Sequence, residues 1–216
     1  GQGLEPGARV AIMLPNVPQF AVTMAAVLRA GYTCVNVNPL YTARELEHQL
    51  KDSGATAIVI LENFAHTLQE VIDKTPVKTV VLTSMGDLLG AVYGRWITFA
   101  VRHLAKMVPA FELPRDNGRK VVAFSDALAK GHSLTLKPAN NDHDSIAFLQ
   151  YTGGTTGLSK GAVLTHRNII AATLQAEAWF TPALSRVGDP TKSNSIAALP
   201  LYHIFALTLC LLAIRQ

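Results

Sequence analysis

Residues 151–161 decide the fold and the chemistry of this chain, and their sequence is Tyr151-Thr152-Gly153-Gly154-Thr155-Thr156-Gly157-Leu158-Ser159-Lys160-Gly161. Glycine loses the most conformational entropy on ordering and fills no volume, so this composition is unsuited to a core. It suits a loop, because glycine accepts positive φ angles and lets backbone amides converge on phosphate oxygens. With the threonine hydroxyls and the mobile charge of Lys160, the stretch is predicted to bind a polyphosphate.

The flanks of this loop separate it from the best-known phosphate loop. A Walker motif needs a Gly-Lys pair followed by Ser or Thr and opens directly into a helix. Here Ser159 precedes Lys160, Gly161 follows it, and the segment 162–164 is typical of a strand. A helical pattern begins only at His166 or Arg167, while 146–151 predicts a strand before the loop. The loop therefore joins two strands, which excludes the kinase and GTPase classes that depend on a Walker motif.

The first eighty residues alternate between strand and helix patterns. Short apolar runs predict buried strands at 10–14, 34–37, 57–61 and 79–82. Between the first two strands, apolar residues at helical spacing predict a helix that ends at Gly31. A capping box formed by Thr42 and Glu45 predicts the start of a second helix, which ends at Gly54. A third helix is expected around 68–72. This alternation predicts an α/β fold, a parallel sheet covered by helices on both faces.

Residues 88–111 interrupt this rhythm with a basic, apolar segment that contains no acidic residue. Arg95, Arg102 and Lys106 are spaced to share one face of a helix, and aromatic and aliphatic residues occupy most of the remainder. Such a helix suits the surface of an anionic membrane. The alternative is a surface helix whose apolar side covers the protein's own sheet.

The loop at 151–161 resembles the phosphate-binding signature of the AMP-forming adenylating enzymes, the superfamily of acyl-CoA synthetases, luciferases and peptide-synthetase adenylation domains. Their pattern is Tyr-Thr-(Ser/Gly)-Gly-(Thr/Ser)-Thr-Gly-x-Pro-Lys-Gly, and only Ser159, in place of proline, departs from it. The resemblance implies that ATP is bound and that Thr152 lies nearest to Mg²⁺. The residues implied at the ATP phosphates are Tyr151, Thr152, Gly153, Gly154, Thr155, Thr156, Gly157, Lys160 and Gly161.

Residues 199–206, which contain His203, resemble a second motif of the same superfamily. From its chemistry alone, a histidine between apolar neighbours has two interpretations, a hydrogen-bonded core residue or a functional group. The resemblance implies an acyl-site role for His203, in which it orients the carboxylate or the adenylate rather than acting as a general base.

Residues 7–38 are similar to the start of the large N-terminal domain of bacterial long-chain fatty acid–CoA ligases. The resemblance implies that a fatty acid reacts with ATP to give acyl-AMP and pyrophosphate, and that the thiol of CoA then displaces AMP. Other acyl-CoA or aryl-CoA ligases and amino-acid adenylation domains remain alternatives, as does a non-catalytic nucleotide-binding or membrane-surface module.

The rest of the sequence bounds the organisation of the protein. Both ends of the 216 residues look cut, so we expect a fragment: a first subdomain at 1–185, which includes 88–111 and 151–161, and the start of a second at 193–216. The C-terminal domain of the superfamily is then absent, and we expect the fragment alone to be inactive. The net charge of +4 comes from scattered basic residues, which argues against nucleic acid as a partner.

Cellular location follows from the cysteines and the apolar tracts. Cys34 and Cys210 are far apart and lie in apolar surroundings, which is typical of reduced core residues in the cytoplasm. Residues 1–9 are polar and do not resemble a signal peptide, and the apolar tract 204–214 is too short to span a bilayer. We expect a cytoplasmic protein, with a peripheral position at the cytoplasmic membrane face if the basic helix binds lipid.

Overall fold

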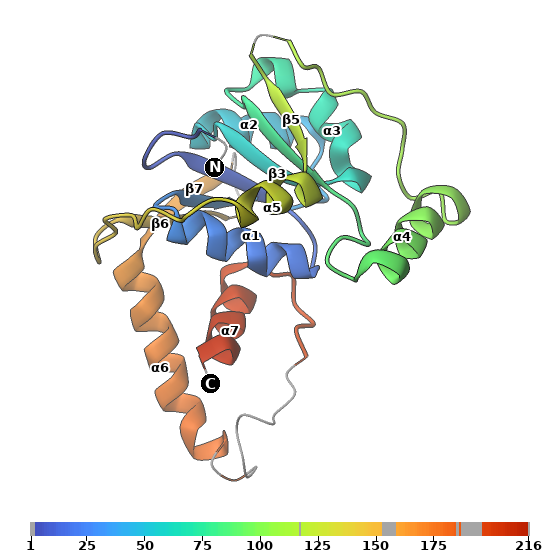
Figure 1. The fold of residues 1–216 in the computed structure, drawn as a ribbon. Helices are drawn as coiled ribbons and strands as arrows, with labels where there is room; N and C mark the ends of the chain where they lie inside the picture. Colours follow the sequence, from blue (N-terminus) through green and yellow to red (C-terminus); the bar gives the residue numbers. More distant parts are fainter. Residues whose placement is uncertain (1–2, 117, 153–158, 185, 187–195, 216) are drawn as a thin grey trace.

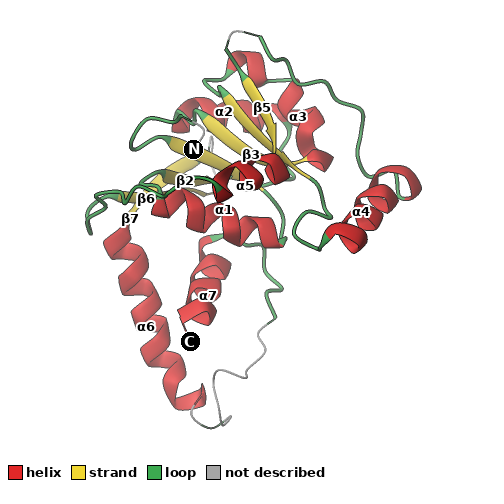
Figure 2. Ribbon diagram, viewed as in Figure 1, coloured by secondary structure: helices red, strands yellow, loops and turns green. Residues whose placement is uncertain are grey.

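The computed structural model describes residues 3–116, 118–152, 159–184, 186 and 196–215. The described residues form one seven-stranded sheet, in the order β5-β4-β3-β1-β2-β6-β7. Its strands are β1 (Arg9–Met13), β2 (Thr33–Asn36), β3 (Ala57–Leu61), β4 (Thr79–Thr83), β5 (Lys120–Ala123), β6 (Ile146–Thr152) and β7 (Lys160–Thr165). Neighbouring strands are parallel except β6 and β7, which pair antiparallel. The predicted α/β class is confirmed (Figure 2).

Helices cover both faces of this sheet, as Figure 1 shows. On one face, α2 (Ala43–Ser53) and α3 (Ala65–Gln69) pack on side chains of β1, β2 and β3. On the other face, α1 (Pro18–Arg29) lies against β1 and β2, and α5 (Phe124–His132) lies against β4 and β5. Strands β2 and β3 are therefore buried at every residue, which explains why the sequence of β3 is a continuous apolar run rather than an alternating one.

Local signals fixed the ends of the first two helices as predicted. Helix α1 ends before Gly31, which adopts a φ of 77°. At the start of α2, the Glu45 amide donates to the Thr42 hydroxyl, and the Thr42 amide donates to the Glu45 carboxylate at 2.8 Å. Gly54 closes α2 in the left-handed region, with a φ of 63°. The capping box and both glycine stops are confirmed.

Two regions between 65 and 132 depart from prediction. The third helix lies earlier than the expected 68–72: α3 spans Ala65–Gln69, and a separate 3₁₀ turn, η2, spans Ile72–Lys74. Strand β5 begins at Lys120 and α5 follows it directly, and neither element was predicted from the sequence. Strand β5 was missed because it has only four residues and gains its stability from parallel pairing with β4, a non-local interaction.

The basic segment forms a shorter helix than predicted. Helix α4 (Ala91–Phe99) continues as a π-helix, η3 (Ala100–Leu104), and Lys106 lies beyond its end with a φ of 52°. The three basic residues therefore do not share one helical face. The alternative in which the apolar side covers the sheet is also wrong, because Trp96 and Phe99 are 60% and 53% exposed. Figure 1 shows α4 at the margin of the molecule, away from the sheet.

The last two helices are α6 (His166–Leu184), which begins where the sequence predicted, and α7 (Ile204–Arg215). Ala206 and Leu207 of α7 join the same core as α1. Cys34 is buried and Cys210 is half-buried, and both are free thiols whose pKa is raised by burial. None of the described helices is both long and apolar enough to cross a membrane.

Candidate functional site

The predicted phosphate loop connects β6 to β7, so it closes an antiparallel hairpin between two strands, as expected. Thr152 and Lys160 face each other across this hairpin, and both side chains are exposed at the mouth of the loop. The predicted phosphate ligands Gly153, Gly154, Thr155, Thr156 and Gly157 lie outside the described residues. Ser159, which replaces the usual proline, donates its hydroxyl hydrogen to the Thr152 carbonyl at 2.7 Å and so links the two sides of the loop.

Tyr151 and Gly161 form the base of the hairpin. The Tyr151 hydroxyl donates to the Asp52 carboxylate of α2 at 2.5 Å, and burial together with this carboxylate raises the pKa of Tyr151. The Tyr151 ring covers Gly161 so closely that a Cβ on Gly161 would lie 2.9 Å from the ring. Because the Tyr151 side chain is held by α2, a phosphate contact from this residue would use its backbone.

Helix α2 also contacts the loop at Ser159, just before strand β7 begins. The Nε2 atom of His48 lies 3.0 Å from the Ser159 carbonyl oxygen. A carbonyl oxygen only accepts hydrogen bonds, so this nitrogen carries the proton. The loop is thus held by α2 at Tyr151, where it begins, and at Ser159, where it ends.

His203 lies at the start of α7. Its carbonyl accepts the Leu207 amide, and its own amide donates to the Pro200 carbonyl, both at 3.0 Å. Its side chain is exposed in the described part of the chain, and its ring centroid lies 4.4 Å from that of Tyr202. The interpretation of His203 as a buried core residue is therefore wrong for this part of the protein, while its acyl-site role stays a prediction.

A chain of buried amides joins the two motifs. The Gln49 side chain on α2 donates to the Asn36 carbonyl at 2.8 Å, the Asn36 side chain donates to Gln150 at 3.0 Å, and Gln150 donates to the Tyr202 carbonyl at 2.9 Å. This chain runs from the α2 face of the sheet to the opposite face. It places His203, the residue after Tyr202, beside the strand that leads into the phosphate loop.

Asn16, which follows β1, holds the same segment from another side. Its side-chain nitrogen donates to the Ala197 and Leu199 carbonyls at 2.9 Å, and its side-chain oxygen accepts the Leu201 amide at 2.8 Å. The carboxyl ends of β1, β2 and β6 thus converge on 197–203. This is the edge at which open α/β sheets bind ligands.

Sequence reasoning missed these positioning amides and His48. A signal was present, because Asn36 and Gln150 are polar residues within otherwise apolar strands and are almost completely buried. Gln49 lies next to Leu50 on the buried face of α2. His48 carried no such signal, since its partner is a backbone carbonyl 111 residues away.

Side chains that could hold a metal ion are dispersed over the part of the chain that the structure describes. Within the described ranges, no three His, Cys, Asp or Glu side chains come together as a cluster. The exposed Thr152 hydroxyl is an oxygen donor of the kind that Mg²⁺ accepts, and Mg²⁺ commonly takes most of its ligands from substrate phosphates and water. Thr152 therefore fits one position in a Mg²⁺–nucleotide complex.

Comparison with known proteins places this geometry in context. Residues 1–215 match the pattern of the AMP-binding enzyme family. The chain is 51% identical over its full length to a long-chain-fatty-acid–CoA ligase of Escherichia coli O157:H7 and covers 37% of that protein. It is 48% identical, over 97% of its length, to a long-chain-fatty-acid–CoA ligase of Haemophilus influenzae and covers 36% of that protein. A crystal structure of a long-chain-fatty-acid–CoA ligase from Archaeoglobus fulgidus superposes with a TM-score of 0.69 at 26% identity, covering 99% of this chain and 35% of that one.

Proposed function

The chain belongs to the AMP-binding enzyme family, and on that premise we propose that it is part of a long-chain fatty acid–CoA ligase. It spans about 37% of the length of the relatives it matches. In the proposed reaction, a fatty carboxylate attacks the α-phosphorus of ATP, the bond to pyrophosphate breaks, and acyl-AMP forms. The CoA thiol then attacks the acyl carbon, loses its proton, and AMP leaves. Adenylation is needed because a carboxylate oxygen is a poor leaving group.

The observation that carries this proposal is the hairpin loop with Thr152 and Lys160 exposed at its mouth. An ammonium and a hydroxyl at this position suit the charge that develops on departing pyrophosphate. The backbone amides and hydroxyls of 153–157 are proposed to complete the cradle, as the family pattern implies. Mg²⁺, when bound, would neutralise phosphate charge, and Thr152 is the residue of this chain that would contact it.

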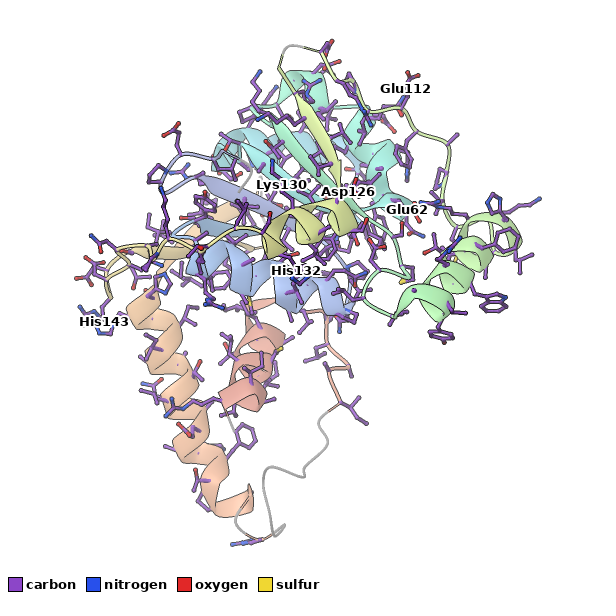
Figure 3. The ribbon with its side chains drawn as sticks, viewed as in Figure 1. Glu62, Glu112, Asp126, Lys130, His132 and His143 are labelled. Atoms are coloured by element: carbon purple, nitrogen blue, oxygen red, sulfur yellow. The ribbon has the colours of Figure 1, made fainter. Side chains whose placement is uncertain are left out.

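Lys160→Ala in the full-length ligase tests this assignment. Loss of one preorganised group that stabilises charge typically costs on the order of 10²-fold in rate. We expect ATP–pyrophosphate exchange to decrease by that factor, with thermal stability unchanged because Lys160 is exposed. The matched control is Lys130→Ala, at an exposed lysine on α5 that is labelled in Figure 3. Wild-type exchange in the Lys160 variant would remove the loop from the mechanism.

The acyl-site role of His203 is proposed on its position beside β6. An exposed imidazole held near the phosphate loop is suited to orient the carboxylate or the adenylate. The division into a first subdomain at 1–185 and a second beginning at 193 is part of the same proposal. We expect residues 1–216 alone to show no exchange, because the family resemblance assigns adenine, ribose and further metal contacts to segments outside this stretch.

We also propose that α4 contacts anionic lipid. The observation that favours this is its free surface: Val92, Trp96 and Phe99 recur at helical spacing and are more than half exposed, with Arg95 exposed beside them. Aromatic side chains next to basic ones suit the interface between headgroups and acyl chains. A fatty acid, which partitions into membranes, would be collected at such a surface.

The test of this membrane contact leaves Arg102 intact, because its guanidinium pairs with the buried Glu62 carboxylate and anchors the segment that contains α4. The variant is therefore Arg95→Glu with Lys106→Glu, and the matched control is Lys130→Glu with Lys137→Glu, which changes the net charge equally at exposed sites. Each basic residue near an anionic surface contributes about 1 kcal/mol, so co-sedimentation with phosphatidylglycerol vesicles should weaken by more than about tenfold in the α4 variant. Equal weakening in both variants would contradict a specific role for α4.

A further inference from the structure

We propose that His48, on a helix outside both family motifs, is a positioning residue for the phosphate loop. The inference rests on the proposed function, because it concerns how that loop is held for ATP. The observation that carries it is the hydrogen bond from His48 Nε2 to the Ser159 carbonyl, at 3.0 Å. Ser159 directly precedes Lys160, so His48 fixes the backbone from which the charged side chain extends.

The helix that carries His48 is rigidly placed. Leu46 and Leu50 are completely buried in the core on the α2 face of the sheet, and the capping box and Gly54 define the two ends of the helix. Near its carboxyl end, Arg9 donates to the Ser53 carbonyl at 2.6 Å. A side chain projecting from this helix therefore has a defined position relative to the sheet.

His48 acts together with Asp52, one helical turn further along α2. Residues four apart lie on the same face of a helix. Asp52 holds the Tyr151 hydroxyl at the entry of the loop, and His48 holds Ser159 at its exit. One face of one helix thus fixes both ends of a glycine-rich segment that is otherwise costly to order.

Losing the His48 hydrogen bond is expected to slow the reaction with ATP without changing which bonds form and break. His48 contacts the backbone of the loop, and its role is to keep Lys160 where a triphosphate needs it. Without the bond, the backbone at Ser159 and Lys160 is less constrained and must be positioned by ATP on binding, so the loss is expected in kcat/KM for ATP. A hydrogen bond contributes a net free energy of about 1 kcal/mol, which corresponds to about a fivefold change in kcat/KM for ATP.

The test compares three substitutions at position 48 in the full-length ligase. His48→Phe keeps the ring and removes the donor, His48→Gln places an amide donor near the same point, and His48→Asn carries the amide one carbon shorter. We expect kcat/KM for ATP in pyrophosphate exchange to decrease about five- to tenfold for Phe and Asn, and to stay within about twofold of wild type for Gln. The same-helix control is Lys51→Gln, which removes only the surface pair with Glu47.

The outcomes separate this inference from the function on which it rests. Wild-type protein without exchange would overturn the proposed function itself. If wild type shows normal exchange and all three variants have the same kcat/KM for ATP as wild type, the role of His48 alone would be overturned. A lower melting temperature with unchanged kcat/KM per folded enzyme would show a purely structural histidine, and failure of Gln to restore activity would show that the donor is not what matters.

Discussion

Helices α2 and α4 both follow buried parallel strands, yet the chain uses them in opposite ways. Helix α2 is capped at both ends, buries Leu46 and Leu50 completely, and contacts the site through three side chains. Helix α4 begins at Gly90 without a side-chain cap in the described structure, and Gly94 is its only buried residue there. The first helix is part of the framework of the site, whereas the second presents a free apolar surface.

The attachment of α4 is concentrated in a few contacts. Arg102 approaches the carboxylate of Glu62 with two nitrogens, its Nε lying 2.9 Å from Oε2, and Glu62 is almost completely buried. Glu62, labelled in Figure 3, follows strand β3 on the side of the molecule toward α4. Gly94 packs directly on Gly86, where either Cβ would overlap the other's carbonyl oxygen. A helix held by so few points keeps most of its surface for another partner.

The largest effect is expected where α2 connects to the His203 segment. Gln150→Leu removes the middle of the buried amide chain and leaves the Tyr202 carbonyl and the Asn36 side chain without their present partners. Each unsatisfied buried group costs about 1–3 kcal/mol, so the unfolding free energy should decrease by about 2–6 kcal/mol for the two groups together. Urea denaturation of the full-length ligase measures this change, and adenylation should decline more than stability accounts for.

A matched substitution distinguishes the amide chain from simple packing. Ile146→Leu alters an exposed residue at the start of the same strand and should leave both stability and exchange near wild type. If Gln150→Leu proved as stable as wild type, the chain of amides would be dispensable, and α2 would be linked to the site only through His48 and Asp52.

An intermediate effect is expected at the anchor of α4. Arg102→Ala leaves the buried Glu62 carboxylate without its charged partner. Because the Arg102 side chain is 46% exposed, we discount the usual value for a buried pair and expect a loss of about 1–2 kcal/mol. Hydrogen exchange should accelerate in 91–104 and remain unchanged in 43–53, and equal acceleration in both helices would contradict the local attachment of α4.

The same contrast explains what the sequence could predict. The strands β1 to β4 and the capping box at Thr42 depend on local pattern, and each was predicted correctly. The strands on either side of the loop at 151–161 were also predicted, while the phosphate-binding role of that loop stays a prediction. Whether the apolar side of α4 is covered or exposed was left open, because amphipathic spacing is the same whether an apolar face meets the sheet or solvent. The pairing of Arg102 with Glu62 and of His48 with Ser159 joins residues 40 and 111 apart, and only the fold brings them together.

A smaller effect is expected at the start of α2. Thr42→Ala removes the hydroxyl that accepts the Glu45 amide, and loss of such a cap typically costs about 1 kcal/mol. We expect faster hydrogen exchange at the first turn of α2 in the full-length protein. Thr42→Ser, which retains the hydroxyl, is the control and should restore protection. If alanine exchanged as slowly as wild type, packing alone would hold α2 in place.

The smallest effect is a pH dependence at the same cap. The Thr42 backbone amide and then its hydroxyl stabilise the charged form of Glu45 and lower its pKa. A carboxylate whose pKa is lower in the folded state stabilises that state above its unfolded pKa, and this stabilisation is lost as the pH decreases through the folded pKa. Protection factors in the first turn of α2 should therefore decrease as the solution is acidified below the usual range of a glutamate, while Glu45→Gln should show no such decrease. Helix α1, whose first turn has no acidic residue, provides the internal reference, and a parallel loss of protection in α1 would assign the change to global acid unfolding instead of the cap.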